Sequence, residues 1–172
     1  MRAQGRSAAA VFVAVAFVAC AACASEDGAR PATADAGGAV PCGGLDQKPS
    51  LTLGVGETPF REIIDGQDFA VTVGPQGLPM LIVSVRVSGL DSRTAEGLAQ
   101  ASYDGALQAT TPIRSSYWAC VEPGGAQASD LLLVLPDRPE DVKGKIAQID
   151  AHIADAEGAQ IAAQIHVMMD LN

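Results

Sequence analysis

The side chains best suited to chemistry in this chain are two histidines and a nearby methionine. His166 and Met168 lie two positions apart in a segment of alternating apolar residues, so a strand would place both on one face. An imidazole and a thioether are soft ligands of the kind that select Cu(I). The pattern offers a copper site at His166 and Met168, with Met80 as a third donor if its loop lies near. The simpler interpretation is a surface histidine beside an edge methionine, which predicts no metal and no cofactor.

A hydrolase with an unrecognised site is a second chemical alternative. The chain has no G-x-S-x-G, no phosphate-binding P-loop and no H-E-x-x-H. A serine hydrolase would have to use His152 or His166 as its base, and both fall on predicted strands among polar residues. We therefore predict no catalytic residue. The acidic stretches 65–68 and 155–158 have the composition of turns rather than of calcium loops.

The N-terminus predicts secretion. Arg2 and Arg6 precede an uncharged apolar run over residues 7–19, which is shorter than the ~20 residues that span a bilayer. The run ends in Phe17-Val18-Ala19-Cys20, which resembles the lipobox of bacterial lipoproteins. The resemblance implies cleavage of a signal peptide, residues 1–19, and lipidation of Cys20. Cys23 is the competing lipid acceptor.

Composition divides the remaining chain into a tether and one domain. Residues 20–41 are mostly Ala, Gly, Pro and Asp, which cannot bury enough apolar surface to order themselves. Residues 42–172 contain the strand patterns and form the expected domain. The whole chain carries a net charge of −9, which excludes nucleic acid as a partner. Attachment to a membrane would therefore come from acyl chains at the N-terminus rather than from basic side chains.

The domain is expected to be all-β, because apolar residues repeat with a period of two. Leu81, Val83, Val85 and Val87 would take one face of a strand, and residues 69–73 repeat the pattern. Residues 131–135 are apolar at every position, which we interpret as a central strand. Further strands are expected at 51–55, 60–64, 106–110 and 115–121, and the composition of 93–102 leaves a helix open.

The last two strands allow the pairing register to be predicted. Apolar residues alternate from Ala147 to Ile153 and again from Ile161 to Met169, on either side of an Asp-Ala-Glu-Gly turn. Both apolar sets reach the same face only if the numbers of paired residues have an even sum. The sum 314 fulfils this with a three-residue loop, 156–158, and places Ile153 opposite Ile161. The same register places Gln148 opposite His166.

This hairpin, over residues 148–167, resembles the last hairpin of bacterial immunoglobulin-like domains, including the polycystic-kidney-disease type. The turns at 56–60, 64–66 and 74–77 resemble those of a group of uncharacterised Gram-negative lipoproteins. The resemblance implies an immunoglobulin-like antiparallel β-sandwich of about seven to nine strands. It also implies a binding or structural module without catalytic activity, lipid-anchored at the outer membrane, with an envelope protein or glycan as partner. The side of the membrane that it faces stays open.

Cysteine positions favour one disulfide. Cys42 opens the domain, Cys120 falls on a mid-chain strand, and the cell envelope is oxidising. Cys23 is the poorer partner because it lies at the far end of the tether, and a buried free thiol at Cys120 is the alternative. Trp118 shares a face with Cys120, so we expect it to pack near the disulfide; an exposed carbohydrate platform is the other possibility.

Overall fold

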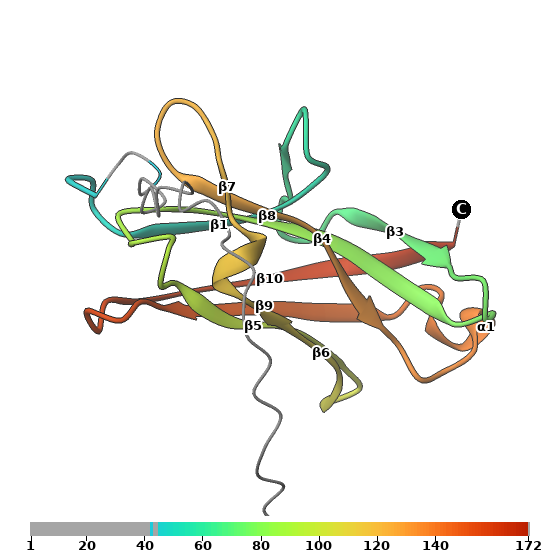
Figure 1. Cartoon of the computed structure of the whole chain (residues 1–172). Coiled ribbons are helices and arrows are strands. Elements are labelled where there is room, and N and C mark those ends of the chain that lie inside the picture. Colours follow the sequence, from blue (N-terminus) through green and yellow to red (C-terminus); the bar gives the residue numbers. More distant parts are fainter. Residues whose placement is uncertain (1–41, 43–44, 172) are drawn as a thin grey trace, which may run out of the picture. The chain divides into compact units, whose positions relative to one another are not determined.

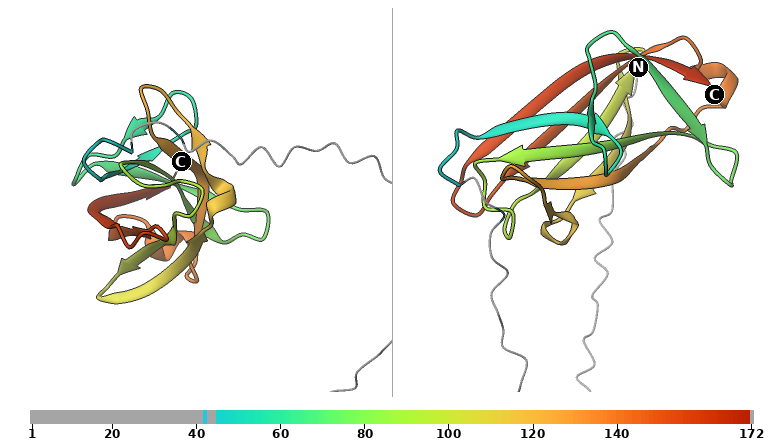
Figure 2. Two further views of the ribbon diagram at one scale, coloured as in Figure 1. Left: turned by 60° about the vertical axis from the view of Figure 1, so that its left-hand side comes forward. Right: turned by 90° about the horizontal axis from the view of Figure 1, so that it is seen from above.

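A computed structural model describes Cys42 and residues 45–171, which form two β-sheets packed face to face (Figure 1). The first sheet has the strand order β2-β1-β4-β8-β7. Its strands are β1 (Ser50–Val55), β2 (Arg61–Glu62), β4 (Pro79–Ser88), β7 (Ala119–Cys120) and β8 (Ala126–Val134). The left view of Figure 2 shows the two sheets as separate layers.

The second sheet has the order β3-β10-β9-β5-β6. Its strands are β3 (Asp68–Val73), β5 (Glu96–Tyr103), β6 (Ala106–Ile113), β9 (Ile146–Ala154) and β10 (Gln160–Leu171). The end of β3 also pairs with β4, so this strand crosses between the sheets and links all ten strands. The described residues further contain a 3₁₀ turn, η1 (Ser115–Tyr117), and one helical turn, α1 (Pro139–Val142).

These layers confirm the expected all-β, immunoglobulin-like sandwich. Ten strands are present, but β2 and β7 have two residues each, so the eight longer strands agree with the expected seven to nine. Pairing is antiparallel except between β3 and β10, which run parallel. The segments predicted to be a signal peptide (residues 1–19) and a tether (residues 20–41) lie outside the described residues, and the predicted domain begins at Cys42.

The core lies between the inner faces of the sheets, and alternation along each strand selects its members. All four apolar residues predicted for one face of β4 are at most 2% exposed. The second sheet contributes mainly small side chains from β5 and β9 together with larger ones from β9 and β10. These buried residues are Ala99, Ala101, Ala147, Ile149, Ala151, Ile153, Val167 and Met169. The alternating pattern therefore specifies both inner faces.

The predicted hairpin register is confirmed. Ile161 lies opposite Ile153, and His166 lies opposite Gln148. Gly158 has a φ of 88°, a left-handed conformation that glycine adopts without a steric penalty. The turn therefore joins β9 to β10 in the register that buries both apolar sets.

Three local expectations need correction. The segment 93–102 is not helical, because β5 begins at Glu96. The expected strand 115–121 is a 3₁₀ turn followed by the two residues of β7. Residues 131–135 are not a central strand: among the described residues, β8 pairs with β4 and otherwise only with β7, which meets it at Ala126 and Gln127. Alternate side chains of β8 consequently face outward.

Candidate functional site

The outer face of the first sheet carries an exposed apolar surface, which we call the apolar block: Leu78, Met80, Ile82, Leu132 and Val134. Met80 lies opposite Val134 and Ile82 lies opposite Leu132, so four of the five side chains form a two-by-two array across β4 and β8. Leu132 and Val134 are 44% and 42% exposed. Leu78, Met80 and Val134 also line a hollow of about 260 Å³ beside the 74–78 turn.

The apolar block lies at the opposite end of the sandwich from Cys42. The backbone N–H of Cys42 donates to Ser92 Oγ at 3.3 Å, just beyond the end of β4, whereas Met80 lies at the start of that strand. Cys42 and Cys120 lie at disulfide distance, with their Cα atoms 4.9 Å apart. Figure 1 shows the C-terminus at the end that carries the β3–β4 turn. The domain is therefore joined to the preceding chain at one end and exposes the apolar block towards the other.

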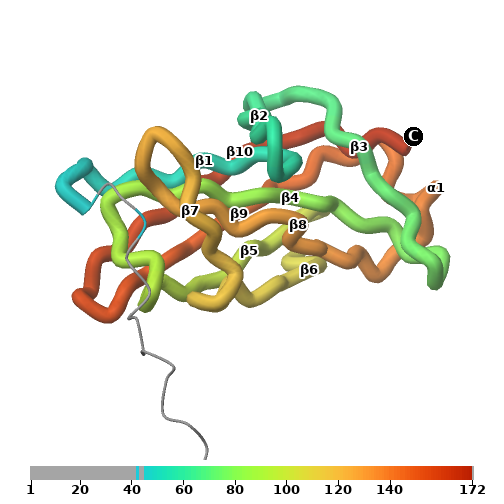
Figure 3. Tube along the Cα trace, turned by 45° about the horizontal axis from the view of Figure 1, so that its top comes forward, coloured from blue at the N-terminus to red at the C-terminus, as the bar shows by residue number. Residues whose placement is uncertain are grey.

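Next to the apolar block, residues 56–67, which we call the β2 arm, lie over part of this outer face (Figure 3). The Phe60 ring lies under the Arg86 guanidinium, with 4.2 Å between its centroid and Cζ. Gln127, only 2% exposed, accepts from Arg86 at 2.8 Å and donates to the carbonyl oxygens of Gly56 and Glu57 at 3.2 and 3.1 Å. A buried amide with these partners is well satisfied, so this network fixes the arm to the sheet.

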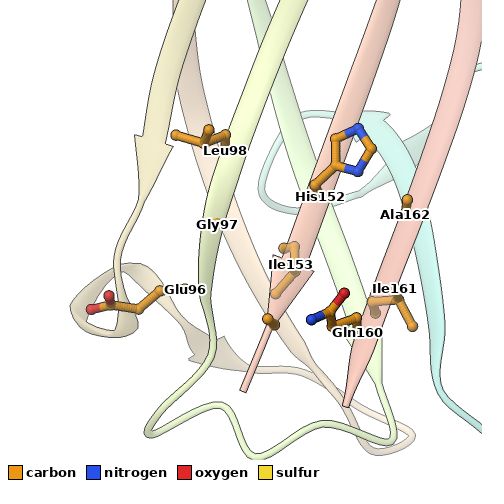
Figure 4. Close-up of a pocket in the computed structure, with 9 residues that line it drawn as sticks. Glu96, Gly97, Leu98, His152, Ile153, Gln160, Ile161 and Ala162 are labelled. Carbon is orange, nitrogen blue, oxygen red and sulfur yellow. The ribbon is translucent and has the colours of Figure 1, made fainter. Parts of the chain in front are cut away.

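A shallow hollow of about 400 Å³ lies on the outer face of the second sheet (Figure 4). Leu98, His152 and Ala162 cross its floor on three neighbouring strands. In Figure 4 the side chains of Glu96 and His152 point in different directions. No serine lines this hollow, so the described residues supply His152 with no nucleophile there.

His166 borders a smaller hollow of about 190 Å³ whose lining also includes Ser102 and Asp104. These three types occur in hydrolase triads, but their positions do not form one. Ser102 and His166 are both opposite Gln148, so they lie two strands apart, about 10 Å. Asp104 is paired with Lys145 at 2.7 Å. The small hollow therefore lacks the contact between nucleophile and base that acyl transfer needs.

His166 and Met168 share the outer face of β10, as the strand period requires. Asp65 of the β2 arm accepts a hydrogen bond from the backbone N–H of His166 at 2.7 Å, and its Oδ1 lies 3.3 Å from His166 Nδ1. The backbone hydrogen bond from His166 is the main cause that lowers the pKa of Asp65 below its ordinary value. Sequence reasoning missed this contact, because 101 residues separate the two.

Neither Met80 nor His152 lies near this pair. Met80 is opposite Thr72 and Met168 is opposite Asp68, so their partners on β3 are four residues, about 13 Å, apart. His152 lies opposite Ala162, four residues from His166 along β10. In the part of the chain that the structure describes, no three His, Cys, Asp or Glu side chains form a metal-binding cluster.

Trp118 packs against the core rather than forming an exposed platform. Its indole N–H donates to the carbonyl oxygen of Ala95 at 2.8 Å, and its ring is half-buried. The 155–158 stretch forms a turn, in which Asp155 Oδ1 accepts from the N–H groups of Glu157 and Ala159. The 65–68 stretch begins in a turn that the N–H of Gln67 closes by donating to the carbonyl oxygen of Ile64 at 3.1 Å, so both acidic stretches contain the expected turns.

No protein-family model matches the chain, and no curated protein matches it. Among solved structures, the chain is similar to the CooA pilin subunit from enterotoxigenic Escherichia coli, with 12% identity and a TM-score of 0.36. The match covers 70% of this chain and 99% of the pilin chain. Within Cys42 and residues 45–171, none of the helices has the length and apolar character needed to cross a bilayer.

Proposed function

We propose that this chain is a lipid-anchored module without catalytic activity, held at the outer membrane of a Gram-negative bacterium, that docks an envelope protein through the apolar block. The observation that carries the proposal is the placement of that block, far from Cys42 and on a sheet face that the β2 arm leaves open. Contiguous exposed apolar patches are features of protein interaction sites.

The point of attachment leaves the block accessible. A lipid on Cys20 would connect through residues 21–41 to Cys42, at the end of the sandwich opposite the block. The junction with the preceding chain therefore does not cover the block.

The chemistry of the block favours a protein over a glycan. Its five side chains are aliphatic or thioether, and residues 79–85 and 131–135 contain no charged residue. The centres of protein interfaces are depleted of charge in the same way. Glycan platforms use exposed aromatic rings, whereas none of the five side chains of the block is aromatic and the N–H of Trp118 is already bonded.

Site-specific crosslinking in intact cells tests the docking proposal. A photo-crosslinking residue at position 134 should form a protein adduct that Leu132→Asp abolishes, and the same group at position 107 should form none. Leu107 is the matched control because it is also an exposed strand leucine, at 58%. Equal adducts at 107 and 134, a crosslinked dimer of this chain, or retention on glycan without a protein adduct would each overturn the proposed partner.

Mass spectrometry of the mature N-terminal peptide tests the anchor independently. We expect a diacylglyceryl group on Cys20, and Cys20→Ser should leave the precursor uncleaved or release the protein from membranes. Lipid on Cys23, or no lipid, would contradict the Cys20 assignment without affecting the docking surface.

A further inference from the structure

The outer face of β10 brings together two soft ligands that the proposed docking function does not use. His166 and Met168 point to the same side, two residues apart, and both are accessible: the His166 side chain is 47% exposed and Met168 is 43% exposed. This spacing, about 7 Å along a strand, lets two side chains converge on one ion above the sheet.

The β2 arm gives His166 the environment of a metal-binding histidine. Asp65 Oδ1 lies 3.3 Å from Nδ1, and Gly66 N–H donates to the carbonyl oxygen of His166 at 2.7 Å, so the carboxylate is held beside the ring. Metal-ligating histidines typically bond their second ring nitrogen to a carboxylate in this way. With the proton on Nδ1, Nε2 carries the free lone pair that a metal requires.

We propose that His166 Nε2 and Met168 Sδ bind one Cu(I) ion on the outer face of the second sheet, with Asp65 as a positioning residue. Binding joins two lone pairs to the ion and involves no electron transfer. The donor set selects the metal: a thioether favours Cu(I), whereas Zn²⁺ requires about four nitrogen, sulfur or oxygen ligands that this face does not supply.

The chain contains a matched control for each ligand. His152 is the second histidine and lies on the same sheet face, four residues away along the ladder. Met80 is a methionine of the first sheet, about 13 Å away along β3. Neither has the Asp65 contact, so replacement of either residue should leave copper binding unchanged.

Competition with a chromogenic Cu(I) chelator under anaerobic conditions tests the site. The mature chain is used with Cys20→Ser and Cys23→Ser in every sample, since free thiols bind Cu(I). Ascorbate serves as reductant, which leaves the Cys42–Cys120 pair intact. We expect one equivalent of Cu(I), a loss of at least tenfold in affinity for His166→Ala or Met168→Leu, and no change for His152→Ala or Met80→Leu.

One NMR measurement keeps the test independent of variant folding. Ag(I), a redox-inert probe for Cu(I), should shift the Met168 methyl resonance and leave those of Met80 and Met169 in place. In a second measurement, Asp65→Asn should weaken binding roughly tenfold and redistribute the His166 ring proton between its nitrogens, which ¹⁵N shifts report. Absence of stoichiometric binding, or binding by His166→Ala or Met168→Leu that is as tight as that of the parent protein, would overturn the proposal.

Discussion

Removal of the link between Cys42 and Cys120 should destabilise the domain strongly. The two residues are 78 positions apart, so the crosslink closes a long loop in the unfolded chain. The chain-entropy relation gives about 4.5 kcal/mol for a loop of this length, and residual structure in the unfolded state lowers this to about 3–4.5 kcal/mol. For a domain of roughly 130 residues, that corresponds to a fall in Tm of about 11–16 °C.

The test compares urea and thermal unfolding of chains that begin at Ala24, which excludes the other two cysteines. Alanine is the right replacement, because Cys42 is buried and a serine hydroxyl there would add a cost of its own. Cys42→Ala, Cys120→Ala and the double variant should lose the same stability, since each removes the same crosslink. The reasoning would be refuted if the double variant unfolds at the wild-type midpoint. It would also be refuted if the stability lost in the double variant equals the sum of the losses in the two single variants.

Three further outcomes follow from the β2 arm. Gly54→Ala should cost about 1–3 kcal/mol in chemical unfolding, because a methyl group would overlap the Phe60 ring; an unchanged midpoint would contradict this packing. Gln127→Leu should cost about 1–3 kcal/mol, because it removes the hydrogen bonds of the buried amide to Arg86 and to the carbonyl oxygens of Gly56 and Glu57, and a neutral result would show that water replaces the amide. Because folding lowers the pKa of Asp65, its carboxylate stabilises the fold at pH values above the unfolded-state pKa. This stabilisation is lost as the pH falls below about 4. When the pH is lowered from 5 to 2, the free energy of unfolding of Asp65→Asn should therefore fall less than that of the wild type. Parallel acid unfolding curves for both proteins would exclude a contribution from the His166 contact.

The parts of the fold that the sequence predicts are those set by alternation within a strand. A one-residue slip of the C-terminal hairpin would expose Ile149, Ile153 and their partners, so the apolar pattern excludes odd slips, and the turn that ends at Gly158 selects among the even ones. The inner face of β4 follows for the same reason.

The role of β8 could not be predicted, because it depends on what lies beside the strand. The run from Leu131 to Leu135 has the composition of a strand buried on both sides, yet Leu132 and Val134 are exposed. Whether an outer face is covered is decided by other segments, here by an arm that ends more than sixty residues earlier in the chain. Composition therefore identifies β8 as a strand without showing that one face is a candidate interface.

The candidate copper site illustrates the same limit at the level of a single side chain. The spacing of His166 and Met168 is visible in the sequence, but the partner of the imidazole is not, because Asp65 approaches from the β2 arm. That arm has two structural effects. Phe60 and Gln127 secure it against Arg86 on the outer face of the first sheet, beside the apolar block. Asp65 and the carbonyl oxygen of Gln67 accept hydrogen bonds from the N–H groups of His166 and Met168 at 2.7 and 2.9 Å, and so hold the arm beside the histidine. Since unpaired strand edges can pair with other chains, these two bonds protect this part of the β10 edge, and the same segment borders both proposed sites.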